Sequence, residues 1–241
     1  DVPKAVFGLK TAVGSLKIAT ERPMQALLLP RAPGAGRPAV LTGPPGFVFH
    51  VAQAYDDDSG RLVLDVIRYG LYPDFDDFTD LFRTPPDGAM PRLERLVLDP
   101  ARHSCEDVSV GADVASHAFE LPISAPAPLG AARRILYGVG APPERRAPYL
   151  TSIHRLDTET GRLTTRDFGL DITGEPMLVP GDGDDEGWLL SLVFRADQDR
   201  TDLVVLRAEN LEIQATAPLP HAVPIGFHGC WVPRGALLGS G

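Results

Sequence analysis

Short runs of β-favouring residues, each closed by Gly, Pro, Asp or Asn, recur along this chain and constrain its fold more than any other feature. The 24 prolines are spread evenly, and each proline inside a helix would remove a hydrogen bond, which argues against long helices. Helical periodicity among the apolar residues is nearly absent. The runs that we predict as strands are 47–55, 61–69, 92–98, 117–121, 150–157, 162–168, 177–180, 188–195, 203–208 and 211–218.

Most of these runs form consecutive pairs joined by a short turn, as in the hairpin closed by residues 56–60. Hairpins in series predict a meandering sheet, and in a chain of 241 residues they favour an all-β fold of the β-propeller type. A sandwich is the alternative, because the sequence shows no exact blade repeat. We expect residues 1–241 to form a single domain. A propeller built from part of its blades would expose sheet edges, which suggests that further blades are missing.

Three kinds of segment depart from the strand pattern. Residues 75–82 (FDDFTDLF) could form a short helix, with Asp74 as its N-cap. Residues 31–38 are rich in Gly and Pro and predict a loop. The acidic runs 56–58 and 182–186 lack the EF-hand pattern, so we interpret them as solvated turns and not as calcium sites.

Charge and cysteine content narrow the function. The net charge of −9 argues against a nucleic-acid partner, which requires a basic surface. Cys105 and Cys230 have neither metal nor redox spacing, which fits a reducing compartment, and we expect a cytoplasmic location. The sequence has no apolar run of about 18 residues and no signal-peptide pattern. Because it begins at Asp1, in a segment that resembles a protein interior, we expect that residues precede it in the natural protein.

Two histidines lie in apolar, glycine-flanked stretches near opposite ends of the chain. His50 closes the run Phe-Val-Phe-His, and His228 lies in the segment 224–231 (PIGFHGCW). A buried imidazole is costly unless both ring nitrogens are satisfied, so the pair suggests one metal centre built by converging strands. Two ligands do not hold a metal, which implies a larger protein or an incomplete site. The alternative is that each is an ordinary packed histidine of a core or loop.

Two glutamates lie among apolar residues in strand-like runs, Glu120 in AFELP and Glu175 in GEPMLV. A carboxylate is expensive to bury alone, but it is well placed as the acceptor for the second nitrogen of a ligand histidine. The alternative is an edge position with the carboxylate in water. The remaining histidines, which we expect to be structural and not ligands, are His103, His117, His154 and His221.

Four motifs, in order, resemble those of the carotenoid cleavage oxygenase family, which includes apocarotenoid and lignostilbene dioxygenases. Residues 49–55 (FHVAQAY) resemble its Phe-His-x-x-Asn-Ala-(Tyr/Trp) motif, and residues 119–122 (FELP) resemble its Phe-Glu-(Phe/Leu)-Pro motif. Residues 174–176 (GEP) and 224–231 resemble its Glu-Pro stretch and its closing signature. The resemblance spans about residues 40 to 233. Gln53 departs from it, because the family usually has Asn there.

This resemblance implies a seven-bladed β-propeller whose axial Fe(2+) is held by four histidines, with this chain forming about the C-terminal half. His50 and His228 would be the third and fourth metal ligands, and Glu120 and Glu175 two of the three outer carboxylates that hydrogen-bond to the ligands. The other ligands would come from the missing N-terminal half. No catalytic residue is implied beyond the metal centre.

The implied reaction is the cleavage by O2 of a conjugated C=C bond in a carotenoid, apocarotenoid or stilbene, giving two carbonyl products. The implied partners are an apolar conjugated small molecule and O2, with peripheral membrane contact as a further possibility. One alternative is a non-catalytic propeller module or inactive fragment. Another is a divalent-metal propeller hydrolase, which would need carboxylate and asparagine ligands at the axis.

Overall fold

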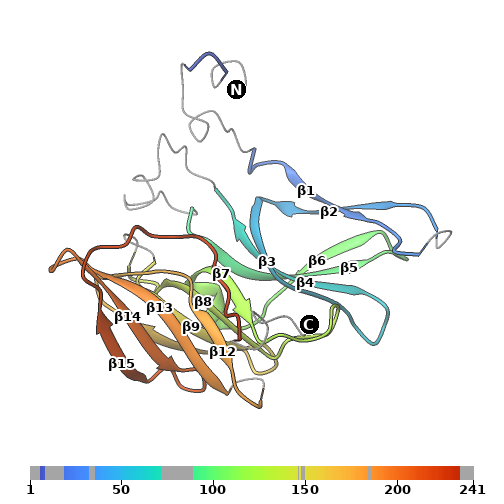
Figure 1. The fold of residues 1–241 in the computed structure, drawn as a ribbon. Helices are drawn as coiled ribbons and strands as arrows, with labels where there is room; N and C mark the ends of the chain where they lie inside the picture. The colour runs from blue at the N-terminus through green and yellow to red at the C-terminus, as the bar shows by residue number, and fades with distance from the viewer. Residues whose placement is uncertain are drawn as a thin grey trace.

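The computed structural model describes residues 6–8, 19–32, 36–71, 89–145, 147, 150–183 and 186–233. Within them the chain forms antiparallel strands in chain order and one short helix, α2 (Ala112–Ser116) (Figure 1). The strands are β1 (Pro23–Leu28), β2 (Ala39–Pro45), β3 (Phe47–Asp56), β4 (Leu62–Tyr69), β5 (Arg92–Asp99), β6 (Ser104–Val108), β7 (Ala118–Ser124), β8 (Ile135–Ala141), β9 (Ser152–Asp157), β10 (Arg162–Asp167), β11 (Ile172–Thr173), β12 (Met177–Pro180), β13 (Gly187–Arg195), β14 (Arg200–Arg207) and β15 (Ile213–Pro218).

The strands form successive meanders, which is the pattern of propeller blades. One sheet has the order β3-β4-β5-β6, the next β10-β9-β8-β7, and the last β11-β13-β14-β15 with β12 also paired to β13. The β1–β2 hairpin is a separate ribbon that extends from this body in Figure 1. Turn residues fix the hairpins: Asp57 accepts hydrogen bonds from the backbone N–H groups of Ser59 and Arg61, and Gly60 has a φ of 74°.

The hydrophobic core lies between successive sheets. One cluster joins the β3–β6 sheet to the β7–β10 sheet, through Ile67 and Leu93 on one side and Phe119 and Leu136 on the other. A second cluster joins the β7–β10 sheet to the last sheet, for example through Ile153 and Val204. Each of the three large sheets therefore packs face to face on the next one in the chain. This repeat of the structure has no counterpart in an exact sequence repeat.

Every residue of β8 is buried in the β7–β10 sheet, which is the middle one of the three large sheets, and two glycines make this close packing possible. A Cβ atom on Gly138 would lie 2.4 Å from the Phe119 ring, and one on Gly140 would lie 1.9 Å from the Ala118 carbonyl oxygen. The space left by these glycines admits Phe119 and His154, whose rings stack with a centroid distance of 5.6 Å. Glycine is required here for close approach and not for an unusual backbone angle.

His154 corrects one expectation from the sequence, which placed it in a polar, solvent-facing setting. It is fully buried in β9, where Nε2 lies 3.1 Å from the Ala118 carbonyl oxygen and Nδ1 lies 3.0 Å from Thr165 Oγ1. The carbonyl can only accept, so Nε2 carries the proton of the neutral ring. Burial, with a smaller contribution from His117, lowers the pKa of His154 from 6.5 to about 3.

We therefore expect this histidine to make the fold acid-sensitive. The unfolded chain binds a proton at His154 near pH 6.5 and the folded chain does so only near pH 3, so stability is complete above 6.5 and falls as the pH drops toward 3. Within this window His154 should remove about 1.4 kcal/mol from the free energy of unfolding per pH unit. Urea unfolding at pH 7 and pH 5 measures this slope. The slope should flatten in His154→Gln, and an unchanged slope in that variant would contradict the assignment.

The observed strands extend the sequence prediction in identifiable places. The predicted hairpins all form, but β14 begins earlier, at Arg200, and β15 begins later, at Ile213. The strands β1, β2, β6, β8 and β11 and the helix α2 were not predicted from sequence. The predicted helix 75–82 and its cap Asp74 lie outside the described residues, as does part of the predicted loop 31–38. Among the helical residues that the structure describes, none form a helix long and apolar enough to cross a membrane.

Candidate metal centre

Two β-bulges in β3 set the direction of His50. The register with β4 shifts between Val48 and His50 and again between Val51 and Gln53, so that His50 lies opposite Ile67 and Gln53 lies opposite Asp65. Directly opposed residues share a face of an antiparallel sheet, and Ile67 and Asp65 are two apart on β4. His50 and Gln53 therefore share the face that packs against the middle sheet, although they are three residues apart. Bulges are a recurrent device for re-aiming a side chain at a functional site.

His50 is hydrogen-bonded to Glu120, which lies on β7 of the neighbouring sheet. Its carboxylate lies 2.6 Å from His50 Nδ1 and also accepts hydrogen bonds from the Tyr69 hydroxyl and the Leu121 backbone N–H, each at 2.7 Å. Leu121 has a φ of 48°, a region that side chains other than glycine rarely adopt, and the register of β7 shifts between Glu120 and Ile123. The backbone bend at Leu121 thus brings the Leu121 N–H to the carboxylate. Glu120 is buried, and each of its two carboxylate oxygens has at least one hydrogen-bond donor.

Glu175 makes the corresponding contact with His228. It follows β11, and its carboxylate lies 2.9 Å from His228 Nδ1 while accepting a hydrogen bond from the Gly229 backbone N–H at 2.7 Å. The carboxylate side chain is only 10% exposed, whereas the His228 side chain is 59% exposed. Glu175 therefore anchors the C-terminal segment through two adjacent residues and leaves the far edge of the imidazole open.

The two histidine–glutamate pairs meet at one place. The rings of His50 and His228 have centroids 5.2 Å apart and lie nearly perpendicular to each other, at 83°. An ionised carboxylate accepts only, so Nδ1 of each ring carries a proton, and in the neutral ring Nε2 then keeps a lone pair. Within the described residues neither Nε2 makes a hydrogen bond. This donor set, two neutral imidazoles held by outer carboxylates, fits a transition metal.

The described part of the chain does not complete a metal site by itself. It contains no group of three or more His, Cys, Asp or Glu side chains arranged to hold a metal ion. The hydrogen bond that His50 donates to Glu120 raises the pKa of His50 above its usual value, against the opposing effect of burial. The structure brings together all four residues singled out from the sequence. Their role as metal ligands and outer carboxylates stays a prediction.

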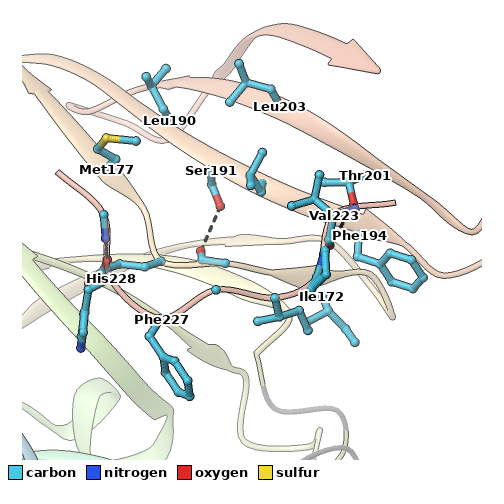
Figure 2. A pocket seen from close by; sticks show the side chains of 17 residues that line it. Ile172, Met177, Leu190, Ser191, Phe194, Thr201, Leu203, Val223, Phe227 and His228 are labelled. Atoms are coloured by element: carbon cyan, nitrogen blue, oxygen red, sulfur yellow. Dashed lines mark hydrogen bonds and ion pairs between the residues drawn. The ribbon is translucent and has the colours of Figure 1, made fainter. Parts of the chain in front are cut away.

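A cleft of about 280 Å³ lies beside His228, between the last sheet and the C-terminal segment. Figure 2 shows Val223, Phe227 and His228 on this segment, running along the sheet face that carries Leu190 and Leu203. The segment is tied down at its start by Thr201, whose hydroxyl accepts a hydrogen bond from the Val223 N–H at 2.9 Å. It is tied down at its end by Glu175. The cleft is therefore a consequence of how His228 is held.

Sequence reasoning missed the donors that fix the two carboxylates, which are the Tyr69 hydroxyl and the amides of Leu121 and Gly229. Of these three donors, only Leu121 could be placed near a glutamate from the sequence, because it directly follows Glu120. The other histidines take no part in the contact between His50 and His228. His117 follows α2 and faces His154, with a centroid distance of 5.6 Å, while His103 and His221 are exposed.

Comparison with known proteins gives one consistent answer. The family model described as retinal pigment epithelial membrane protein matches residues 2–233. An apocarotenoid-15,15'-oxygenase from Synechocystis sp. is 34% identical over 94% of this chain and 46% of its own length. A carotenoid cleavage oxygenase from Mycobacterium tuberculosis is 30% identical over 78% of this chain and 38% of its own length.

Solved structures agree with these sequence matches. Cobalt-substituted Synechocystis ACO has a TM-score of 0.80 and 32% identity, covering 95% of this chain and 48% of that one. An ACO/RPE65 chimera has a TM-score of 0.80 and 30% identity. The likeness to these β-propeller enzymes confirms the all-β propeller class predicted from the sequence. The chain spans about half the length of the curated relatives it matches.

Proposed function

The chain belongs to the retinal pigment epithelial membrane protein family, to which the carotenoid cleavage oxygenases also belong, and we propose that it is the C-terminal part of an iron(II) dioxygenase. In this proposal residues 1–241 form part of one propeller domain, and the N-terminal blades supply the remaining metal ligands. The observation that carries it is the contact between the rings of His50 and His228, each of which is hydrogen-bonded to its own glutamate.

The proposed reaction splits a conjugated C=C bond with O2 to give two carbonyl products. The C=C and O–O bonds break and two C=O bonds form, so atoms and electrons balance without a further reductant. When bound, iron(II) supplies the redox chemistry that lets dioxygen react with an alkene. His50 and His228 would bind the ion through Nε2. Glu120 and Glu175 would hold each ring in one tautomer and raise its basicity.

The substrate that we propose is a carotenoid or apocarotenoid. Several relatives with significant similarity are named for such substrates, including a zeaxanthin 7,8(7',8')-cleavage dioxygenase of Crocus sativus. A stilbene or related phenylpropanoid is the second candidate, because an isoeugenol monooxygenase of Pseudomonas putida is 29% identical over 77% of this chain. Both candidates are apolar and conjugated, so they would need the same apolar approach to the metal.

The decisive test uses the full-length protein loaded with Fe(2+) under anaerobic conditions. We expect stoichiometric iron and, after O2 is admitted, paired aldehyde products from an apocarotenoid, identified by liquid chromatography and mass spectrometry. A stilbene assayed in parallel separates the two substrate classes. A folded full-length protein that binds no iron and cleaves neither compound would instead support the non-catalytic propeller module.

A further inference from the structure

Gln53 is a motif position at which this chain departs from the family pattern, and in the structure its side chain has two specific hydrogen-bond partners. The side chain is buried, at 7% exposure, on the face of β3 that it shares with His50. Its Nε2 donates to Asp65 Oδ2 at 2.6 Å, and its Oε1 accepts from the Arg133 backbone N–H at 2.6 Å. One amide thus bridges β4 of its own sheet and a segment of the neighbouring sheet.

The partner of Gln53 on β4 is held rigidly. Asp65 is fully buried, and Arg95 on β5 donates to its two carboxylate oxygens at 2.7 and 2.8 Å. A buried carboxylate is stable only when its acceptor sites are filled, and here Arg95 and Gln53 fill them. Because Arg95 holds Asp65 in place, the hydrogen bond to Asp65 fixes the position of the Gln53 side chain.

The second partner, Arg133, lies in the connection between β7 and β8, and β7 carries Glu120. The strand β3 is consequently tied to the middle sheet at two levels: His50 to Glu120, and Gln53 to the Arg133 amide. Two hydrogen bonds fix both the distance between β3 and β7 and the position of β3 along β7. A single hydrogen bond would leave β3 free to shift along β7.

We propose that Gln53 is a positioning residue for the metal centre, one that sets the slide of β3 against β7 and so holds His50 Nδ1 on Glu120. This inference rests on the proposed function for its metal readout, and its geometric part concerns the His50–Glu120 hydrogen bond alone. Side-chain length is the specific requirement. Asparagine is shorter by one methylene, about 1.5 Å, so its amide cannot reach both Asp65 and the Arg133 amide at hydrogen-bond distance.

The test compares Gln53→Asn and Gln53→Met with wild type in the full-length protein. Gln53→Asn shortens the amide, and Gln53→Met keeps the length but removes both hydrogen bonds. We expect Fe(2+) binding weakened about 10-fold in Gln53→Asn and more in Gln53→Met, the range seen when outer partners of metal ligands are lost. In metal-free protein labelled with 15N-histidine, the His50 Nδ1–H resonance should move upfield as its hydrogen bond to Glu120 lengthens.

Two controls separate positioning from general destabilisation. Gln214→Asn makes the same chemical change at an exposed position of β15. Asp202→Asn weakens a buried ion pair with Arg195 in the last sheet, so it lowers stability away from His50. If Gln53→Asn matches Asp202→Asn in its melting temperature yet keeps wild-type iron affinity and a wild-type His50 resonance, Gln53 is only structural. If wild type binds no iron, the proposed function fails, while the resonance still decides the role of Gln53.

Discussion

Replacing His228 by alanine is expected to abolish stable iron binding by the full-length protein, and with it any oxygen-dependent cleavage. His228 and His50 are the two donors that this chain brings together, and Glu175 has no other imidazole to hold in the described structure. Loss of a ligand should cost more than the roughly 10–100-fold that loss of an outer hydrogen-bond partner costs. Metal content by mass spectrometry after dialysis, with Fe(2+) titration of the apoprotein, measures the effect.

The matched control is His221→Ala, a change of the same type in the same C-terminal segment. His221 is exposed, so its removal should leave iron content, affinity and unfolding unchanged. Should His228→Ala retain full iron while His221→Ala loses it, the ligand assignment is wrong and the closing signature has been misread. If both variants retained wild-type iron content, His228 would not be a metal ligand.

Replacing Gly140 by alanine is expected to prevent stable folding. The new Cβ atom would lie 1.9 Å from the Ala118 carbonyl oxygen and 2.7 Å from His154 Nε2. Relief requires β7 and β8 to move apart, which breaks ladder hydrogen bonds and the buried contact of His154 with Ala118. Core overpacking costs about 1–3 kcal/mol in ordinary cases, and a backbone clash in mid-sheet should exceed this, at about 4 kcal/mol or more.

Chemical unfolding followed by circular dichroism measures this loss. Gly226→Ala is the control, because a Cβ atom there would meet no heavy atom within 4 Å and the backbone needs no unusual φ. It should unfold as wild type does. A Gly140→Ala protein as stable as wild type would mean that β7 and β8 are not paired in the register described here.

The hairpins could be predicted from sequence because their turns are chemically explicit. Residues 56–60 (DDDSG) and 158–161 (TETG) contain the residues that cap and reverse a chain, and the flanking runs are rich in β-branched residues. β8 was missed for the opposite reason: its glycines look like turn residues until Phe119 and His154 are seen to fill their space. β9 (SIHRLD) reads as mostly polar, yet every one of its residues is buried.

The candidate site divides in the same way. The histidines and glutamates could be named from sequence because imidazoles and carboxylates inside apolar runs demand partners. The pairing of each glutamate with its histidine could not be predicted from sequence, because His50 and Glu120 are 70 residues apart and meet only when two sheets pack together. The network of Gln53, Asp65 and Arg133 was also out of reach, since it depends on a register shift that no local propensity encodes.

The paired bulges of β3 also constrain how this stretch can vary in length. Strand side chains alternate, so removing one residue between His50 and Gln53 would exchange inward and outward positions for one of the two. The His50 imidazole or the Gln53 amide would then point to the opposite side of the sheet, although every chemical group was retained. The three-residue spacing is thus as much a part of the site as the side chains. A sequence alignment that opens a gap here would assign a different pair of residues to the face that packs against the β7–β10 sheet.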